Sequence, residues 1–574
     1  MKKNLLAAAV FAAFFAISGI AQHTLPSTTT NATSSRIRLV ETPVYSIPAP
    51  NMEMIHREDA EQDKKGMAYR NGVASFVNIT ALNQGLWTTQ NGVRTWKLRI
   101  KSKGAEALSF IFSKLVLPEG ASVWVENESR TFQSDKVYKA DMLEDLQNII
   151  SLCHGDDLTV VLQEPVETSG QAVLEIGRVF YHYRATGAPA PEKGLGDSDE
   201  NCEVNINCPE GNDWQDEKKG VARVLVIDGG NGYWCSGSLV NNLAADCKPL
   251  FLTALHCGIS TSASDMNLWE FYFRYEATGC TTPGFITGVN ANKLLPKGCF
   301  RLADSNDDGG NSGSDFLLIQ LGTSANAATM ITNLKATGAY WNGWDANNTP
   351  SASGVSIHHP AADIKKISTY TAALTTSGWN SSLQSHWRVT WAPTSNGHGI
   401  TEGGSSGSPI FTTNGGNSRI VGTLTGGGSY CSTPYAQDYY GKFSYHWASN
   451  GSPTNERLKT YLDPANTGLL IINGSYDPCN QGLGINENGT DGIFQGVSFF
   501  PNPAQDDLSI DLSTLPAEFS IAIEVFDMTG HLVSRQETHA GATAIVHLQQ
   551  LSAGLYQVRL QTGSYHMMRK ISKM

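Results

Sequence analysis

The sequence predicts a mainly β protein with several domains. It contains 56 glycines among 574 residues, and 40% of the residues are hydrophobic whereas only 16% are charged. Short apolar runs alternate with turns rich in Gly, Asn and Ser, a pattern typical of strands rather than helices. A chain of this length exceeds what one hydrophobic core organises, so we expect about three or four domains.

The charge pattern disfavours nucleic acid as a partner. The formal net charge is −12, and no stripe of Lys and Arg runs along the chain. Nucleic-acid binding depends on clustered cations that neutralise phosphates, so we expect none here. A low density of charge is also typical of extracellular proteins.

Residues 1–21 predict a signal peptide. Lys2 and Lys3 precede an apolar run that ends in Gly19-Ile20-Ala21, ahead of Gln22. The run is short for a membrane span and ends in small residues suited to cleavage. We therefore expect a protein that is secreted or attached to the cell surface. The ten cysteines fit an exported, disulfide-bonded protein.

Residues 22–193 predict a β-rich domain of their own. Trp96, Leu98 and Ile100 alternate with charged residues, as in a strand with one buried face. A linker of Ala, Gly, Pro and charged residues follows at 185–193, where a domain boundary and a protease-accessible bond are expected. We interpret this domain as a pro-segment that keeps an enzyme silent or assists its folding. The alternative is an accessory binding domain.

Three short motifs in the central region, residues 194–475, predict a nucleophilic site. One apolar run ends on His256, another begins at Asp315, and Ser406 lies in a glycine-rich turn before a third. Such a turn holds a serine hydroxyl clear of bulky neighbours, although many Gly/Ser runs are plain loops. The chain order histidine, aspartate, serine is one of those that build a catalytic triad.

The same turn predicts an oxyanion hole. The backbone amides of Gly404 and Ser406 would form it, and each donor of such a site is typically worth about a hundred- to a thousand-fold in rate. Strand spacing by itself allows barrels or a sandwich. Two barrels with the triad in the crevice between them would account for the wide spacing of its three residues.

Longer blocks of the central region accompany these motifs: Asn201-Cys202 with Cys208-Pro209-Glu210-Gly211, Cys235 to Asn242, Ile357-His358-His359-Pro360, Thr401-Glu402 with the serine turn, and Leu462-Asp463-Pro464-Ala465. Together they resemble the secreted lysyl endopeptidases, a branch of the chymotrypsin-type serine proteases. The resemblance covers residues 194–474. It implies a chymotrypsin-like double β-barrel in which His256 is the general base, Asp315 orients it and Ser406 is the nucleophile.

The resemblance also implies three disulfide bonds: Cys202–Cys431, Cys208–Cys280 and Cys235–Cys257. Within the same region Cys247 and Cys299 remain, and we expect them to pair with each other. Cys153 and Cys479 lie outside it and receive no predicted partner. Counting alone would leave about a hundred pairings of eight cysteines open.

Asp438 is the predicted specificity residue. A carboxylate at the base of an apolar pocket selects a substrate cation, whereas the alternative is a solvated surface aspartate. The family's matching aspartate binds the lysine ammonium, so lysine rather than arginine is implied by the resemblance alone. Gly426 and Gly427 should pair with the substrate backbone as an added strand. Thr425 replaces a histidine that in the family stacks on a tryptophan, and Trp379 would be the remaining half of that pair.

We therefore expect a secreted, monomeric serine endopeptidase that cleaves proteins or peptides after lysine. The alternatives are arginine or mixed-basic specificity, and an adhesin built on an inactive protease scaffold. No organic cofactor or metal is implied: the run Asp304–Gly309 resembles half of a calcium loop, but its twelfth position is Asp315. Lys193-Gly194 in the linker offers a bond that such an enzyme could cut to release itself.

Residues 476–495 predict a linker, and residues 496–574 a further β domain. Tyr556, Val558 and Leu560 alternate with polar residues, as in a half-buried strand. Together with Phe499-Phe500-Pro501-Asn502-Pro503, this segment resembles the C-terminal sorting domain of type IX secretion cargo. The resemblance implies an immunoglobulin-like β-sandwich that is recognised by outer-membrane secretion machinery. The pattern alone fits a carbohydrate-binding or adhesive sandwich equally well.

Overall fold

The structure is a computed structural model. It describes residues 41–63, 67–127, 132–138, 148–184, 201–283, 296–322, 327–381, 383–413, 418–479, 494, 497–517, 519–527, 530–562 and 565–574. The predicted signal peptide, the Lys193-Gly194 bond and most of the predicted 476–495 linker lie outside these residues. No helix in the described ranges is long and apolar enough to cross a membrane.

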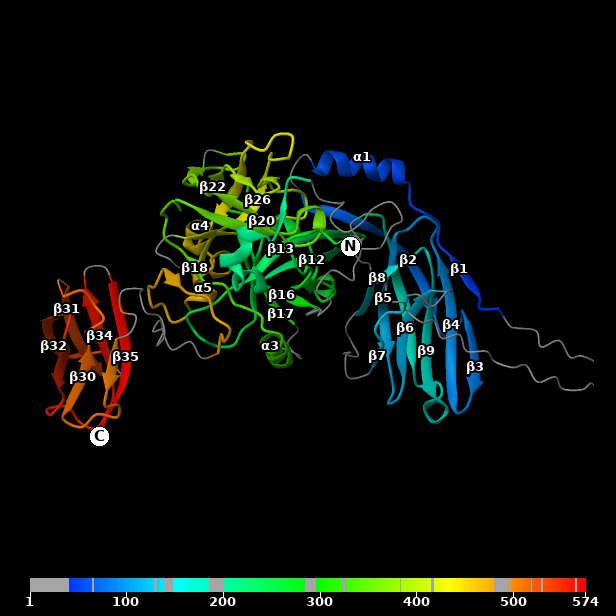
Figure 1. The fold of residues 1–574 in the computed structure, drawn as a ribbon. Coiled ribbons are helices and arrows are strands. Elements are labelled where there is room, and N and C mark those ends of the chain that lie inside the picture. Colours follow the sequence, from blue (N-terminus) through cyan, green and yellow to red (C-terminus); the bar gives the residue numbers. More distant parts are fainter. Residues whose placement is uncertain are drawn as a thin grey trace, which may run out of the picture. The chain divides into compact units, whose positions relative to one another are not determined.

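The described residues from 42 to 184, in the region predicted to be a pro-segment, form mainly two sets of strands (Figure 1). The first set pairs in the order β1 (Val44–Ser46), β4 (Val93–Lys101), β9 (Asp157–Pro165), β6 (Ser122–Asn127) and β7 (Val137–Tyr138), with β3 (Leu86–Gln90) on β4. The second runs β2 (Tyr69–Thr80), β10 (Val173–His182), β5 (Ala107–Val116) and β8 (Asn148–His154). Trp96, Leu98 and Ile100 of β4 are buried, as their alternation predicts. Helix α1 (Met52–Asp63) has no counterpart in the sequence prediction.

The first protease barrel is a closed ring of strands. Its order is β16 (Cys299–Asp304), β17 (Leu317–Leu321), β14 (Leu250–Thr253), β13 (Asn231–Leu239), β12 (Val221–Asp228) and β15 (Glu270–Tyr272). The ring closes where the Phe271 amide donates to the Pro296 carbonyl at 3.0 Å, just before β16 begins. In β12 both faces are covered, so the strand is buried from Val221 to Ile227 and is apolar apart from Arg223 and the terminal Asp228.

The second protease barrel closes in the same way. Its order is β20 (Lys366–Tyr370), β19 (Gly354–His358), β25 (Pro409–Thr412), β26 (Arg419–Gly427), β27 (Asp438–Lys442) and β22 (His386–Val389). The Ala392 amide, just after β22, donates to Thr369 of β20 at 2.8 Å and completes the ring. The predicted chymotrypsin-like double β-barrel is therefore confirmed.

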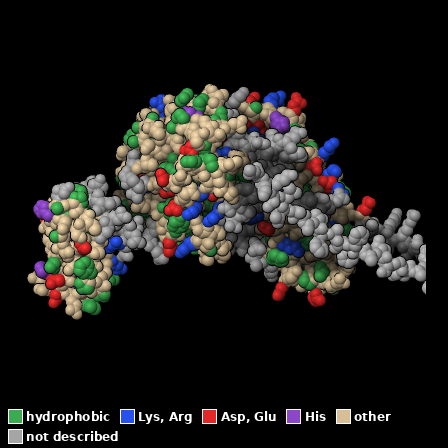
Figure 2. Space-filling view, viewed as in Figure 1, with side chains coloured by type: hydrophobic (Ala, Val, Ile, Leu, Met, Phe, Trp, Pro, Cys, Tyr) green, Lys and Arg blue, Asp and Glu red, His purple; other side chains and the backbone are tan. Residues whose placement is uncertain are grey.

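Short elements surround the two barrels. The strands are β11 (Val204–Asn205), β18 (Trp344–Asp345), β21 (Thr375–Ser377), β23 (Pro393–Thr394), β24 (Gly397–His398) and β28 (Ile471–Ile472), and the helices are α2 (Ala263–Met266), α3 (Ala327–Ala336), α4 (Phe443–Ala448) and α5 (Lys459–Leu462). On the face seen in Figure 2, cationic and anionic side chains are interspersed on the described surface. The sheet of the first barrel continues into the N-terminal strands, because β13 pairs antiparallel with β2.

The C-terminal residues form a β-sandwich, as predicted. One sheet contains β29 (Ser498–Phe500), β30 (Asp507–Asp511) and β33 (Thr543–His547), and the other runs β32 (Leu532–His539), β31 (Ser520–Asp527), β34 (Gly554–Thr562) and β35 (Tyr565–Lys573). The alternation predicted in β34 is confirmed. Tyr556, Val558 and Leu560 are buried in the core between the sheets.

Four disulfides are present, and one differs from the expectation. Cys202–Cys431, Cys208–Cys280 and Cys235–Cys257 occur as the resemblance implies. The expected Cys247–Cys299 bond is wrong, because Cys247 bonds Cys479 instead.

Burial explains this difference. Cys299 opens β16 inside the barrel core with 1% exposure, and its thiol lies 3.5 Å from the Met266 carbonyl oxygen. Cys247 is half-buried in the loop before β14, out of reach of that core. The bond to Cys479 attaches the start of the predicted 476–495 linker to the loop before β14. Cys153 and Cys299 are the free cysteines among the described residues, and both are buried.

Candidate active site

His256 and Asp315 form a tightly coupled pair. His256 lies in a short 3-10 turn, Leu255–Cys257, that follows β14. Its Nδ1 lies 2.7 Å from Asp315 Oδ2, and its backbone amide donates to Asp315 Oδ1 at 2.9 Å. Both carboxylate oxygens therefore hold the same residue. This arrangement fixes the plane of the imidazole and places the proton on Nδ1, which leaves Nε2 as the basic nitrogen.

The charges of this pair are mutually stabilising. Burial disfavours the charged form of His256, but the adjacent Asp315 carboxylate outweighs it, so the pKa of His256 is raised above its ordinary value. Burial likewise opposes ionisation of Asp315, yet the charge and hydrogen bonds of His256 hold the pKa of Asp315 below its ordinary value. The histidine is thus a stronger base than a free imidazole, and its partner stays ionised.

Asp307 supports the pair from behind, although the sequence analysis assigned it no role. Asp315 has a left-handed backbone with φ of 58°, which costs a residue other than glycine about 1–3 kcal/mol. Asp307 Oδ2 accepts a hydrogen bond from the Asp315 amide at 2.8 Å, and its Oδ1 accepts one from Gly310 at 3.0 Å. Burial and the nearby Asp315 raise the pKa of Asp307. Its position in an acidic run was visible in the sequence, but its partners were not.

The turn that carries Ser406 lies against the histidine. The Ser406 carbonyl accepts a hydrogen bond from the Ser236 amide at 2.8 Å, and Cys257 Sγ lies 3.8 Å from the same oxygen. Cys257 directly follows His256, so the disulfide to Cys235 fastens the histidine segment to β13, the strand whose Ser236 amide bonds the serine turn. Within the described residues, the buried His256 Nε2 has no hydrogen-bond partner. Nε2 is therefore not bonded to the serine hydroxyl here, and catalytic contacts of this kind often tighten only with substrate bound.

The two predicted oxyanion donors are free. In the part of the chain that the structure describes, neither the Gly404 nor the Ser406 amide donates a hydrogen bond. Gly404 has φ of 94°, and a Cβ atom there would lie 2.7 Å from the Ala362 amide nitrogen. Only glycine fits this position. The turn can therefore offer two unoccupied N–H groups to a developing negative charge.

Asp438 is a buried carboxylate held by neutral donors. It opens β27 with 0% exposure, so the alternative of a solvated surface aspartate is wrong. Its Oδ2 accepts hydrogen bonds from Trp391 Nε1 at 2.6 Å, Thr401 Oγ1 at 2.7 Å and Ser429 Oγ at 2.6 Å. Its Oδ1 accepts one from the Ser429 amide at 3.1 Å. Burial raises the pKa of Asp438 against the opposing effect of these bonds, and no described cation contributes.

Gly427 covers this carboxylate. It pairs with Asp438 across β26 and β27, and a Cβ atom on Gly427 would lie 1.8 Å from Asp438 Oδ1. Gly427 is exposed, whereas Gly426 beside it is buried. The carboxylate therefore lies directly beneath a solvent-facing stretch of backbone. The three donors Trp391, Thr401 and Ser429 were not predicted, because nothing in their spacing points to Asp438.

Thr425 has no aromatic stack, as its identity requires. Its hydroxyl lies 3.0 Å from His386 Nε2. Trp379, the predicted remaining half of the pair, instead makes an edge-to-face contact with Tyr439 at 5.5 Å between ring centres. Trp379 still lies close to Thr425, since a Cβ atom built on Gly310 would be 3.2 Å from the threonine and 3.3 Å from the tryptophan.

Solved structures resemble parts of the chain at low identity. A thermostable serine protease, AL20, from an extremophilic microorganism is 16% identical with a TM-score of 0.27, covering 41% of this chain and 99% of that one. Protease Anisep from Arthrobacter nicotinovorans is 18% identical with a TM-score of 0.28, covering 40% of this chain and 92% of that one. Because both TM-scores are low, the fold assignment rests on the sheet topology.

Sequence comparisons place two domains within families. A curated protein named lysyl endopeptidase, from Pseudomonas aeruginosa, is 31% identical over 307 residues, which is 50% of this chain and 59% of that protein. The chain thus matches less than two thirds of this relative's length. Residues 195–441 match the family model of the lysyl endopeptidase C-terminal domain, and residues 498–574 match that of the secretion system C-terminal sorting domain. Residues 195–441 are therefore similar to the C-terminal domain of lysyl endopeptidases, and residues 498–574 to the C-terminal sorting domain of a secretion system.

Proposed function

We propose that this protein is a secreted serine endopeptidase that hydrolyses peptide bonds on the carboxyl side of lysine. The observation that carries the proposal is the buried Asp438 carboxylate, which has neutral donors around it and no cation among the causes of its shifted pKa in the described part of the chain. It belongs to the same domain as the coupled His256–Asp315 pair and the Ser406 turn. A charge left unmatched in this way is costly unless a ligand supplies the cation.

The residues have distinct roles in the proposed reaction. Ser406 Oγ attacks the substrate carbonyl while His256 Nε2 takes its proton, and the same nitrogen later gives the proton to the leaving amine. Asp315 holds the imidazole and stabilises its charged form. The amides of Gly404 and Ser406 receive the oxyanion of the tetrahedral intermediate. Water then releases the acyl group by the same steps.

The hydrogen bonds of Asp438 favour an ammonium over a guanidinium. Each carboxylate oxygen offers about two lone pairs. Oδ2 already accepts three donors, whereas Oδ1 accepts only one. The free capacity is therefore on a single oxygen, beneath Gly427. A lysine ammonium is a compact point charge that one oxygen satisfies, but an arginine fork prefers two oxygens side by side.

A digest tests this function against its rivals. One denatured substrate protein is incubated with the enzyme, and the carboxyl-terminal residues of the fragments are read from their masses. Fragments that end in lysine support the proposal, whereas ends in arginine, or in both residues, would establish the broader specificity. Labelling of Ser406 by an active-site serine reagent separates an enzyme from an inactive scaffold.

We also infer that residues 42–184 act as an inhibitory pro-segment. Tyr69 of β2 lies against Gly403, since a Cβ atom on that glycine would be 2.6 Å from Tyr69 Cδ2. Gly403 directly precedes the oxyanion donor Gly404. Arg184 holds the tyrosine in place, with its guanidinium carbon 3.8 Å from the ring centre. The pro-segment thus touches the turn on which catalysis would depend.

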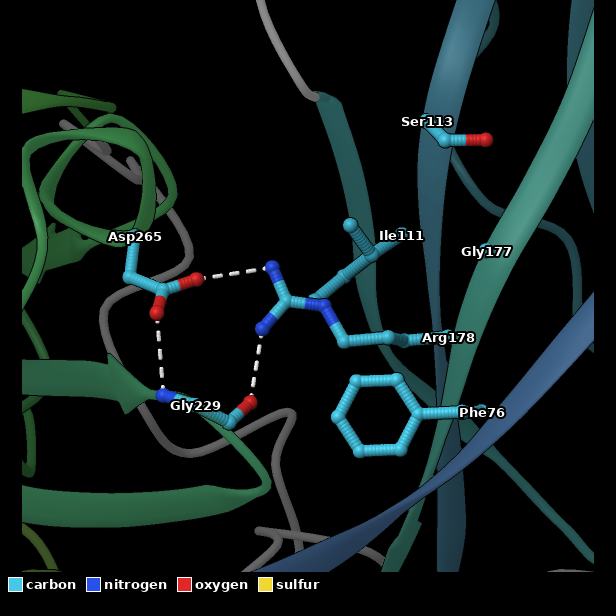
Figure 3. A pocket seen from close by; sticks show the side chains of 7 residues that line it. All are labelled: Phe76, Ile111, Ser113, Gly177, Arg178, Gly229 and Asp265. Carbon is cyan, nitrogen blue, oxygen red and sulfur yellow. Dashed lines mark hydrogen bonds and ion pairs between the residues drawn. The ribbon is translucent and has the colours of Figure 1, made fainter.

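A second contact joins the pro-segment to the protease through Arg178, and we call it the arginine clamp. Figure 3 shows the Arg178 guanidinium between Asp265 and Gly229, beside Phe76. Arg178 donates to Asp265 Oδ1 at 2.7 Å and to the Gly229 carbonyl at 2.6 Å, and the same aspartate accepts from the Gly229 amide at 2.9 Å. Arg178 is 7% exposed, so the ion pair is largely removed from water. Breaking a buried pair of this kind is expensive.

Replacing Asp438 should remove the specificity of the enzyme. Asp438→Asn keeps the shape but deletes the charge and replaces one acceptor oxygen with an NH2 group; losing one charge of a buried pair costs about 2–5 kcal/mol. We expect kcat/KM for lysyl substrates to fall by roughly thirtyfold or more. Asp463→Asn is the matched control, because Asp463 is also buried at 2% exposure but only caps Thr467 and Gly468. Equal losses in both variants would contradict the assignment.

The pH profile should report the His256–Asp315 pair. The enzyme needs His256 neutral, and the Asp315 charge, outweighing burial, raises the pKa of His256 above the ordinary histidine value. Activity should therefore rise with pH along a limb whose midpoint lies above that value. The measurement is kcat/KM for a lysyl peptide against pH. A midpoint below the ordinary histidine pKa would show that the carboxylate does not act on the imidazole.

Self-processing should depend on Ser406. A full-length Ser406→Ala chain is expected to accumulate as a precursor, and added active enzyme should cut it between Lys193 and Gly194. N-terminal sequencing of the product identifies the bond. A Ser406→Ala precursor that matures at Lys193 without any added protease would contradict the proposal.

Loss of the arginine clamp should loosen the pro-segment. In the Ser406→Ala background, the linker is cut by an added protease and the fragments are separated by size exclusion. We expect Arg178→Gln to lower the fraction of pro-segment that stays bound, because the Asp265 carboxylate loses its partner. Arg99→Gln is the control, since Arg99 pairs with Asp157 inside the pro-segment itself. If both variants retain the same fraction of bound pro-segment, Arg178 does not contribute to its binding.

A further inference from the structure

Ser236 connects the nucleophile turn to the body of the protease. It lies on β13, directly after the disulfide cysteine Cys235, with 0% exposure. Its amide donates to the Ser406 carbonyl at 2.8 Å, and its hydroxyl donates to the Gly404 carbonyl at 2.8 Å. One side chain and its own backbone therefore hold two residues of the turn. These are the same two residues whose amides are the proposed oxyanion donors.

The hydroxyl of Ser236 is fully used. Besides donating to Gly404, it accepts a hydrogen bond from the His359 amide at 3.1 Å. Its carbonyl accepts one from Thr253 Oγ1 at 2.7 Å. No other described acceptor competes with the Gly404 carbonyl for the hydroxyl proton. The proton is therefore committed to the turn.

Gly404 needs such a restraint. A glycine with φ of 94° has no Cβ atom to limit its rotation, and its own amide is bonded to no described group. The direction of that amide therefore depends on what holds the neighbouring atoms. On one side, Gly404 packs closely against the turn from His359 to Ala362. A Cβ atom built on Gly404 would lie within 3 Å of the Ala362 amide nitrogen and of the His359 carbonyl oxygen. On the other side is the bond from Ser236.

The supporting turn is itself fixed. Ala361 and Ala362 have left-handed backbones with φ of 44° and 59°, an arrangement that persists only where the surroundings impose it. Arg223 is buried and donates to the Ala362 carbonyl at 2.7 Å, with its guanidinium 3.7 Å from the centre of the Tyr275 ring. The chain from the His359 amide through Ser236 Oγ to the Gly404 carbonyl joins this rigid turn to the nucleophile turn.

We propose that Ser236 is a positioning residue for the oxyanion hole, an inference that rests on the proposed protease function. By fixing the carbonyls of Gly404 and Ser406, it keeps the two amides on either side of Ser405 directed at one point. The substrate carbonyl gains its negative charge only in the transition state. A misdirected amide therefore costs transition-state binding while the pocket at Asp438 still holds the lysine.

The test compares Ser236→Ala with a matched control. Ser238→Ala removes another buried hydroxyl from the same strand, one that bonds the Leu239 carbonyl and Asn342 and does not touch the nucleophile turn. Both variants lose stability, because each leaves buried partners unsatisfied. We expect Ser236→Ala alone to lower kcat for a lysyl peptide amide, by tenfold up to about the thousandfold seen when one oxyanion donor is deleted. KM should stay within about twofold for both variants, since ground-state binding is retained.

Inhibitor binding separates positioning from general damage. A peptide aldehyde that ends in lysine mimics the tetrahedral state, whereas a peptide acid that ends in lysine only fills the pocket. We expect Ser236→Ala to weaken binding of the aldehyde by the same factor as it lowers kcat, and to leave binding of the peptide acid unchanged. Ser236→Thr, which keeps the hydroxyl, should restore most of both. If Ser236→Ala fails to fold, Ser236→Cys carries the same measurement with a weaker donor of similar size.

The outcomes distinguish this inference from the function on which it rests. Wild-type enzyme that neither cleaves lysyl substrates nor reacts with a serine reagent would overturn the proposed function and this role together. An active wild type whose Ser236→Ala variant melts at a lower temperature but keeps its kcat would overturn only the role of Ser236. Equal losses of kcat in Ser236→Ala and Ser238→Ala would do the same, because they would reflect loss of structure.

Discussion

The buried carboxylate of Asp315 is the interaction on which the site depends. It sits at 0% exposure, where an isolated charge would be prohibitively costly, and the imidazole and amide of His256 bind both of its oxygens. Its backbone is left-handed, and a second carboxylate, Asp307, holds that backbone in place. The loop between β16 and β17 thus holds the Asp315 carboxylate against Nδ1 of His256.

A buried charge needs partners, and the two carboxylates of the site have partners of different kinds. Asp315 is matched by a group that gains charge during the proposed reaction. Asp438 is surrounded by hydroxyl, indole and amide donors, which lower the cost of burial without cancelling the charge. The first arrangement creates a base, and the second leaves an attraction for a cation from outside. The protein therefore uses hydrogen-bond partners, rather than burial alone, to assign a role to each acid.

The sequence was informative where chemistry lies within a short segment. The runs that end or begin at His256, Asp315 and Ser406, the alternation in β4 and β34, and the turn with Gly404 could each be interpreted locally. Asp307, Ser236 and Thr401 could not, because their partners are backbone or carboxylate groups far away along the chain. The predicted bond between Cys247 and Cys299 was wrong for a related reason. The pairing depends on which cysteine lies in a barrel core and which lies in a half-buried loop, and only the packed structure decides that.

The bond between Cys247 and Cys479 has a mechanical consequence. Residue 479 is the last described residue before the segment that leads to the sorting domain, and the disulfide fastens it to the loop ahead of β14. Force applied to the C-terminal domain, as during transport or while anchored at a surface, is delivered to the first barrel through sulfur. The short ladder between β28 and β18 and the contact of Ser475 with Trp341 are thereby shielded from peeling. A pull on the C-terminal domain would therefore act on the Cys247–Cys479 bond before it acts on residues 471–475.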